Sequence, residues 1–452
     1  MMRITLGLFL LLGVASLAAW VANIQGEVQI ILAGYQLVAP VAVLIGVGIL
    51  LALAGLVLML GLRFLWRLPG RTRARLQRQR LEQGELAMAE ALMALARGDA
   101  HAAGQATSVA RQKLPHKALP RLLAAQASIL QGTPEAAERE YQKMLDADTT
   151  PQQKALGLEG LFYGARRRGD DAAAAAYATQ VLQLAPHSAW ALDGLMAMAV
   201  QAEDWPSAEN WLRRWARTGQ KRGRVRHRRS VVYMAQAQAE IAQDTKQGRS
   251  RALQLADKAS AEQSDFVPAL ALRARLHAAD GNLSKARRVL RQAWARQPHV
   301  ELAEAWLACY GEQPASTKLR AVSSLTGKNP QHEESYILRA RVALDGQRGS
   351  LAQTLLQKLI AAYASPSQVP RRLCQLMAEA EASIGDMAAA QSWQDRASRA
   401  PLEAGWVAAG LRLQAWQAVC PVTGNLGTVV WGMVSQPASH LTAVRELGNG
   451  AA

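Results

Sequence analysis

The chain has 452 residues, of which half are apolar and only 5% are aromatic. This apolar content excludes a disordered chain. The apolar share is dominated by Ala and Leu, which lose little freedom in a helix, so the composition favours helices and disfavours β-sandwiches and barrels. Cys309, Cys374 and Cys420 lie far apart in sequence, which excludes a disulfide framework and a Cys-x-x-Cys metal site.

The formal net charge of +17 is concentrated in two short segments. Each segment carries seven cations and no acidic residue. A general nucleic-acid binder more often shows a basic face that recurs along the fold, so we predict no nucleic-acid partner. The first cluster contains Arg63, Arg67, Arg71, Arg73, Arg75, Arg78 and Arg80, and the second contains Arg217, Lys221, Arg222, Arg224, Arg226, Arg228 and Arg229.

Two stretches without a charged residue precede the first basic cluster. Residues 4–22 and 37–62 are 19 and 26 residues long, and the hydrocarbon core of a bilayer requires about 20 apolar helical residues. Pro40 lies near the start of the second stretch, where its missing N–H costs least. We predict two transmembrane helices within residues 1–62, joined by the loop 23–36. A cleaved signal peptide is the alternative for the first stretch.

The distribution of charge around the two stretches predicts their orientation. Lys and Arg are retained on the cytoplasmic side of a membrane, and residues 63–83 form a basic segment directly after the second stretch. The loop between the stretches contains Glu27 and no Lys or Arg, and Arg3 precedes the first stretch. We predict a multi-pass membrane protein with a periplasmic or extracytoplasmic loop, both termini in the cytoplasm, and arginines that contact anionic lipid headgroups.

From residue 84 to residue 401 the chain repeats itself at intervals close to 34 residues. Turns such as Arg97-Gly98-Asp99, Arg168-Gly169-Asp170 and Gly385-Asp386 separate paired apolar runs of helical spacing. Gly permits the left-handed conformation that ends one helix, and Asp caps the next. One helix pair cannot bury its apolar face alone, so the pairs must stack. The pattern resembles the tetratricopeptide repeat and implies an all-α solenoid, with units starting near 84, 118, 155, 189, 233, 267, 299, 333 and 371.

The second basic cluster falls in the longest interval between predicted unit starts, from 189 to 233. We expect it in a connection that follows the helix containing Trp211 and Trp215, with a further insertion near Gln243–Arg251. Three interpretations are open for this basic loop. It is a solvated connection, a contact with anionic lipid, or a docking surface for an acidic partner.

No motif in the sequence indicates catalysis. A phosphate-binding loop, a dinucleotide fingerprint, a zincin motif and a nucleophile elbow are all absent. We therefore predict no enzymatic activity, no catalytic residue and no cofactor. Haem is the one cofactor considered, and it would need a His or Cys that faces an apolar pocket. The histidines are dispersed: His101, His116, His187, His227, His277, His299, His332 and His440.

The character of the chain changes in the C-terminal tail, residues 402–452. The segment Trp416-Gln417-Ala418-Val419-Cys420-Pro421-Val422-Thr423-Gly424 is similar to the second half of a rubredoxin-like zinc ribbon. Such a ribbon needs four ligands, yet Thr423 occupies the partner position and no Cys lies near Trp406. We predict a degenerate ribbon, or a β-like tail packed on the end of the solenoid, without zinc.

The order of these features resembles the HemY-type proteins of proteobacteria. The resemblance is carried by Gln25-Gly26-Glu27-Val28-Gln29-Ile30, by Leu65-Trp66-Arg67-Leu68-Pro69-Gly70-Arg71 and by Ala94-Leu95-Ala96-Arg97-Gly98-Asp99-Ala100. It implies an inner-membrane protein with a cytoplasmic repeat domain, associated with the late steps of protoporphyrin and haem biosynthesis. The family offers no catalytic residues to carry over. An unrelated flavin-dependent porphyrinogen oxidase shares the name, but its dinucleotide fingerprint is absent from this chain.

These observations predict a membrane-anchored scaffold. A stacked solenoid presents an extended groove that binds helices or extended peptides, and the resemblance makes haem-biosynthesis enzymes the candidate partners. Two alternatives remain: a tetrapyrrole-binding protein of the same pathway, and a regulator of envelope lipopolysaccharide assembly.

Overall fold

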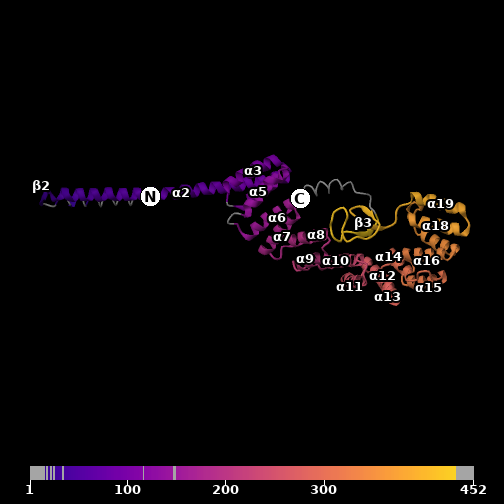
Figure 1. Ribbon diagram of the computed structural model, residues 1–452. Helices are drawn as coiled ribbons and strands as arrows, with labels where there is room; N and C mark the ends of the chain where they lie inside the picture. Colours follow the sequence, from indigo (N-terminus) through magenta and orange to yellow (C-terminus); the bar gives the residue numbers. More distant parts are fainter. Residues whose placement is uncertain are drawn as a thin grey trace. The chain divides into compact units, whose positions relative to one another are not determined.

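The computed structural model describes residues 16, 19–20, 23, 26–32, 35–115, 117–145 and 149–433. The chain divides into two compact units, Met1–Ala127 and Ser128–Ala452 (Figure 1). The first predicted transmembrane stretch, residues 4–22, lies almost entirely outside the described residues and stays a prediction.

The first unit contains a β-hairpin where the sequence predicts a loop. Strands β1 (Glu27–Leu32) and β2 (Tyr35–Pro40) pair antiparallel, with Glu27 opposite Pro40. The backbone N–H of Val41 donates to the carbonyl of Gly26 and closes the hairpin. Residues 37–40, which the sequence assigns to the second membrane helix, are therefore part of β2.

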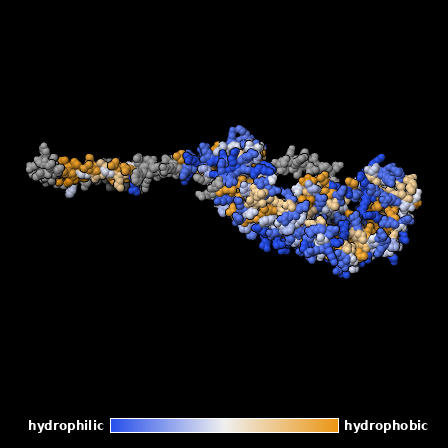
Figure 2. Space-filling view, viewed as in Figure 1, coloured by the Kyte–Doolittle hydropathy of each residue, from blue (hydrophilic) through white to orange (hydrophobic). Residues whose placement is uncertain are grey.

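Helix α2 (Val41–Ala96) is continuous over 56 residues. Its N-cap residue is Pro40, which agrees with the expected position of this proline at the helix start. The segment Val43–Arg63 is long and apolar enough to cross a membrane, and none of its apolar window is buried (Figure 2). Among the described residues it is the one helix that meets this criterion.

The first basic cluster lies on this same helix, so the predicted basic segment 63–83 is not separated from the apolar segment by a turn. The side chains of Arg63, Arg78 and Arg80 are exposed. A rigid helix thus runs from the apolar segment into the first repeat. The remaining arginines of the cluster have side chains outside the described set, namely Arg67, Arg71, Arg73 and Arg75.

The C-terminal part of α2 serves as the first helix of the first repeat. It packs against α3 (Ala100–Lys113), with Ala94 and Ala103 buried between them. Gly98 has a φ of 74°, and the Asp99 carboxylate accepts a hydrogen bond of 2.9 Å from the N–H of Ala102. The predicted turn chemistry is confirmed here. Helix α4 (Ala118–Leu130) follows.

The second unit consists of stacked helix pairs. In each pair we call α6, α8, α10, α12, α14, α16 and α18 the first helices and the others the second helices. Across the described chain, six helices begin within one residue of a predicted unit start. These helices begin at residues 118, 189, 267, 300, 333 and 371. The bounds are α5 Pro134–Leu145, α6 Pro151–Arg168, α7 Asp171–Leu184, α8 Ala189–Gln201, α9 Trp205–Trp215, α10 Arg222–Ala242, α11 Lys246–Glu262, α12 Val267–Ala279, α13 Leu283–Arg296, α14 Val300–Ala308, α15 Ala315–Thr326, α16 Glu333–Asp345, α17 Gly349–Ile360, α18 Arg371–Ile384 and α19 Met387–Arg399.

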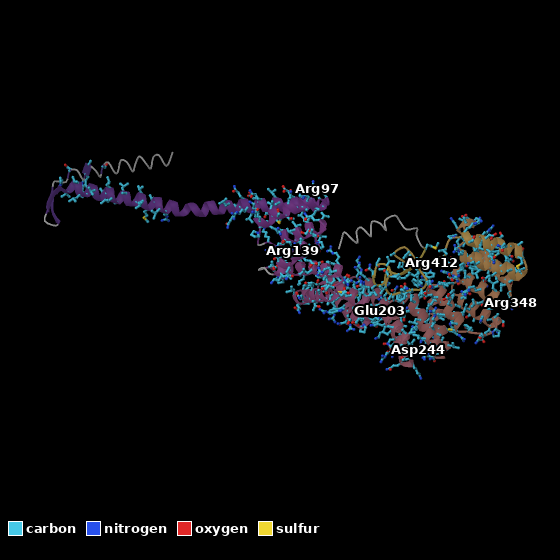
Figure 3. The ribbon with its side chains drawn as sticks, turned by 45° about the horizontal axis from the view of Figure 1, so that its top comes forward. Arg97, Arg139, Glu203, Asp244, Arg348 and Arg412 are labelled. Carbon is cyan, nitrogen blue, oxygen red and sulfur yellow. The ribbon has the colours of Figure 1, made fainter. Side chains whose placement is uncertain are left out.

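The turns between paired helices use a residue with positive φ, which is glycine in some turns and another residue in others. At Gly169 and Gly385 glycine adopts φ values of 75° and 97°, as the sequence predicts. At Glu203, Asp244 and Gln347 other residues adopt positive φ in equivalent turns. Figure 3 labels Glu203 and Asp244 at two of these turns. The backbone conformation is thus imposed by the packing of the pair even where glycine is absent.

Small residues line the contacts between helices, and tryptophans fill the wider gaps. Ala174 and Ala178 are completely buried, because two helix backbones approach closely there. Trp294 is also completely buried, and its indole N–H donates to the Ser335 hydroxyl over 3.3 Å. Trp306 and Trp215 are buried as well. These three tryptophans therefore pack inside the solenoid rather than on its surface.

Gly349 marks the closest approach between α17 and α18. A Cβ at this position would lie 2.0 Å from the Ser383 hydroxyl and 3.1 Å from the Ala380 carbonyl. We expect Gly349→Ala to destabilise the solenoid by about 1–3 kcal/mol, because overpacking shifts a neighbouring helix. Gly223 has open space around it, so Gly223→Ala should change stability by less than about 1 kcal/mol. Urea midpoints of the detergent-solubilised chain measure both, and equal midpoints would contradict the packing described.

Candidate partner-binding groove

The C-terminal tail folds into a small β-structure, which we call the C-terminal module (residues 402–433). Its three strands are β3 (Gly405–Ala408), β4 (Leu411–Leu413) and β5 (Val430–Gly432), in the order β4-β3-β5 and antiparallel throughout. Trp406 on the central strand β3 lies opposite Trp431 on the neighbouring strand β5. The predicted β-like character of the tail is therefore present within residues 402–433.

One loop of the C-terminal module has the backbone arrangement of a metal knuckle. The N–H of Thr423 donates to the Cys420 sulfur over 3.4 Å, and the N–H of Gly424 donates to the Cys420 carbonyl over 2.9 Å. Burial raises the pKa of Cys420, but hydrogen bonds from Thr423, Val422 and Thr428 outweigh it and hold that pKa below its usual value.

The residues around this knuckle do not fit a zinc ion. The turn between β3 and β4 offers Ala408 and Leu411 where a second pair of ligands would be required. Ala408 and Cys420 are instead buried in an apolar cluster with Val429. No group of three or more metal-ligating side chains occurs among the described residues. Apolar packing therefore stabilises this module, as a bound metal stabilises an intact ribbon.

The C-terminal module packs on the middle of the solenoid rather than on its end, which corrects that expectation. One buried cluster joins Val231 and Met234 of α10 and Phe266 at the start of α12 to Trp406 and Trp416 of the C-terminal module. Figure 1 shows the C-terminal module, in yellow, against the first helices of this unit. Local sequence signals could not place it, because its docking partners are more than 100 residues away.

Two polar anchors hold the C-terminal module on the first helices. The Trp406 indole N–H donates to the Glu301 carboxylate of α14 over 2.6 Å. The His227 ring of α10 bridges Gly427 and Gln263, with Nε2 2.8 Å from the Gly427 carbonyl and Nδ1 3.0 Å from Gln263 Oε1. The sequence did not indicate Glu301 or His227 as anchoring residues. They therefore define the covered part of the first-helix face, from α10 to α14.

The same contact covers two ionisable groups, of which His299 is buried and Glu301 is half-buried. His299, at the start of α14, is 3% exposed and lies under Trp431, with ring centroids 4.2 Å apart. Its Nδ1 accepts a hydrogen bond from the N–H of Glu301, and its buried Nε2 has no partner in the part of the chain that the structure describes. Burial, aided by the charge of Arg372, lowers the pKa of His299 to about 4. Burial also raises the pKa of Glu301, against the opposing hydrogen bond from Trp406.

A second part of the first-helix face, on α6 and α8, carries exposed aromatic surface. Tyr163 is 45% exposed and stacks on Trp190, with ring centroids 6.4 Å apart. Leu156, seven residues before Tyr163 on α6, is also exposed. Burial raises the pKa of Glu159, and burial together with the carboxylates of Glu159 and Asp193 raises the pKa of Tyr163. We call Leu156, Tyr163 and Trp190 the open aromatic patch.

Most of the second basic cluster is helical, which differs from the predicted basic loop. Arg222–Arg229 form the first two turns of α10. Three members are paired: Arg226 with the Glu262 carbonyl, Arg228 with Asp193, and Arg229 with Glu262. The other four are exposed and form no ion pair with another described residue: Arg217, Lys221, Arg222 and Arg224.

The predicted insertion near Gln243–Arg251 takes the form of a turn at Asp244 followed by the start of α11. It adds no separate surface. Both departures from the regular period therefore lie in one pair, α10 and α11, whose helices are 21 and 17 residues long.

Few of the histidines are available to a ligand. His227 is engaged by the C-terminal module, and His277 and His299 are buried. Open cavities of about 700 Å³, between α18 and α19, and about 410 Å³, between α11 and α13, have no histidine in their walls. The larger cavity is lined by Cys374, and burial raises the pKa of that thiol. His101, His187 and His332 are exposed, whereas His116 and His440 lie outside the described residues.

A tetratricopeptide-like solenoid with an apolar N-terminal helix is the class of protein that these features define. Residues 26–132 match the family model described as the HemY protein N-terminus. The chain is thus similar to HemY-type proteins over these N-terminal residues. The match spans β1, β2, α2, α3 and α4, and so covers the apolar helix and the first repeat. No curated protein matches the chain.

Several solved structures are similar to this chain at low scores. A structure of Naa15/Naa10 bound to HypK-THB matches with 13% identity and a TM-score of 0.41, covering 72% of this chain and 59% of that one. This chain thus spans less than two thirds of that relative. The C-terminal part of a TPR repeat-containing protein from Cytophaga hutchinsonii matches with 12% identity and a TM-score of 0.35, covering 61% of this chain and 94% of that one. A tetratricopeptide repeat protein from Parabacteroides merdae matches with 16% identity and a TM-score of 0.24, covering 66% of this chain and 99% of that one.

The burial of His299 makes docking of the C-terminal module depend on pH. The buried ring stays neutral down to about pH 4, whereas a released ring takes up a proton near pH 6.5. Docking should therefore be unaffected above pH 6.5 and weaken as pH falls towards 4, by about 2 kcal/mol at pH 5. Glu301 acts in the opposite direction, because its raised pKa favours the docked form as pH falls.

Fluorine NMR of 5-fluorotryptophan-labelled protein would follow this change through the Trp406 signal, assigned with Trp406→Phe. His299→Asn keeps an oxygen that can cap α14 but removes the titration, so it should abolish the loss at low pH. A loss of equal size in this variant would rule out His299 as its source.

Proposed function

We propose that this protein is a membrane-anchored scaffold whose first-helix face binds protein partners of late protoporphyrin and haem biosynthesis. The observation that carries the proposal is the open aromatic patch on α6 and α8. Tyr and Trp are enriched at the energetic centres of protein interfaces, and Tyr163 remains 45% exposed on a first helix. The HemY-type N-terminal match supports the link to haem metabolism.

The chemistry of the patch indicates the kind of segment that fits it. Tyr163 and Trp190 offer apolar ring surface, and no ion pair to Glu159 is formed among the described residues. An amphipathic helix or extended peptide with apolar side chains and a Lys or Arg would satisfy both features. The groove of a solenoid is suited to such a segment because it is long and rigid.

Anchoring would add to this binding. The apolar part of α2 is continuous with the first repeat helix, so a partner that is also held at the membrane meets the groove at high effective concentration. Porphyrins are poorly soluble, and enzymes that handle them would benefit from being held together. The arginine run after Arg63 supports the proposed placement of the repeats in the cytoplasm and of both termini on that side.

Affinity purification from detergent-solubilised membranes tests the scaffold. The wild-type chain should recover a haem-pathway enzyme, and Tyr163→Ser should reduce its recovery at least fivefold, because the exposed ring surface is lost. Gln180→Ser, at an exposed position on the second helix α7, is the matched control and should bind as wild type. Equal recovery by all three proteins would contradict binding at the open aromatic patch.

The proposed topology has its own test. A fluorescent protein that matures only in the cytoplasm, fused after the last residue, should fluoresce. A cysteine introduced at Gln25 should react with a membrane-impermeant maleimide in intact spheroplasts, and one at Gln131 should react only after lysis. Labelling of the second position before lysis would overturn a cytoplasmic repeat domain.

The larger cavity favours one alternative, a tetrapyrrole-binding protein. Its walls carry Arg396 and Arg399, whose guanidinium groups suit propionates, beside Cys374. Titration of the chain with haemin should then give a Soret shift that Arg396→Ala and Cys374→Ser both diminish. A spectrum unchanged by either substitution would remove this alternative.

A further inference from the structure

The C-terminal module is held in the manner in which a groove holds a separate peptide. One aromatic side chain, Trp406, is inserted and donates to Glu301. One main-chain carbonyl, that of Gly427, lies in hydrogen-bonding contact with His227. Anchoring by a Trp and by backbone groups is the general mode by which proteins recognise peptide segments. The first helices from α10 to α14 therefore already display a binding site, with its ligand in place.

This contact also contains features that a permanent core avoids. His299 Nε2 is buried without a hydrogen-bond partner among the described residues, and the ionisable Glu301 is half-buried at the same contact. A buried polar group without a partner forfeits its hydrogen bonds to water. Both groups would recover water if the C-terminal module left. The apolar contacts of Trp406 and Trp416 are thus opposed by a desolvation cost that release would remove.

The covered site and the open aromatic patch lie on the same row of first helices. Arg166 of α6 donates to Gln201 of α8 over 2.6 Å, and Asp193 of α8 pairs with Arg228 of α10. These contacts join α6, α8 and α10 side by side. Departure of the C-terminal module would therefore extend the open patch into one surface from α6 to α14.

We propose that the C-terminal module is a displaceable internal ligand of the groove. Its competitor is a protein segment that carries an exposed aromatic side chain with an N–H or O–H donor, which takes the place of Trp406 on Glu301. This inference rests on the proposed function and identifies the chemistry of the partner segment. Because the C-terminal module is tethered to α19 by a few residues, its effective concentration is on the order of millimolar. The intact chain should bind such a segment weakly and the released chain more tightly.

Cleavage of the tether in the otherwise complete chain tests the proposal. A specific protease site is inserted between Leu402 and Glu403, and the detergent-solubilised chain is immobilised through its N-terminus before cleavage. The C-terminal fragment should then dissociate during washing, and the helical circular-dichroism signal of the retained solenoid should persist. Glu301→Ala combined with His227→Ala should speed release at least tenfold. Glu379→Ala, an exposed position on α18, is the control and should release as wild type.

The washed solenoid is then offered a fluorescent peptide of residues 403–413, which contains Trp406. This peptide should bind at least tenfold more tightly to the washed solenoid than to the uncleaved chain, and its Trp406→Ala version should bind neither. A fragment that leaves only in denaturant, a solenoid that unfolds when it leaves, or equal binding of the two peptides would overturn the proposal. Release and peptide binding without recovery of any haem-pathway enzyme from membranes would instead contradict only the proposed function.

Discussion

The structure depends on the inability of a single pair of helices to bury its own apolar face. Completely buried alanines such as Ala174, Ala208 and Ala286 let successive helices approach closely, so each pair is stabilised by the next. This stacking uses the faces between pairs and leaves one face of every first helix free. That face carries both the open aromatic patch and the residues that hold the C-terminal module. The proposed binding surface is therefore the surface that stacking leaves uncovered.

The free face is divided into two parts by the chain itself. From α10 to α14 it is filled by a β-structure that keeps the knuckle of a zinc ribbon but replaces its ligands with apolar residues. On α6 and α8 it remains open and aromatic. Two tryptophans of this module, Trp406 and Trp416, are among the residues that contact the solenoid. The groove along the first helices is therefore filled from α10 to α14 and open on α6 and α8.

Local patterns in the sequence were sufficient to predict the repeats. Gly169-Asp170 and Gly385-Asp386 are turn signals that act within a few residues, so the helix pairs could be located from them. The same is true of the knuckle at Cys420, which depends on the spacing to Thr423. Elements of this kind are encoded in short segments, and their prediction does not require the tertiary fold.

Features that depend on distant partners could not be predicted in this way. Arg222–Arg229 has the charge density of a loop, but it is helical, and Glu262 and Asp193, more than 30 residues away, pair with three of its arginines. The anchors of the C-terminal module join His227 to Gly427 and Glu301 to Trp406, across 200 and 105 residues. The candidate site is therefore the part of the molecule for which sequence was least informative, since only tertiary packing brings its residues together.

The central claim is that the first-helix face is the surface on which partners bind. Photo-crosslinking in intact membranes tests it most directly, with benzoylphenylalanine placed at Tyr163 on the open aromatic patch or at Gln180 on the second helix α7. The account predicts a covalent adduct with another protein from position 163 and none from position 180. Adducts of equal yield from both positions, or from position 180 alone, would contradict it.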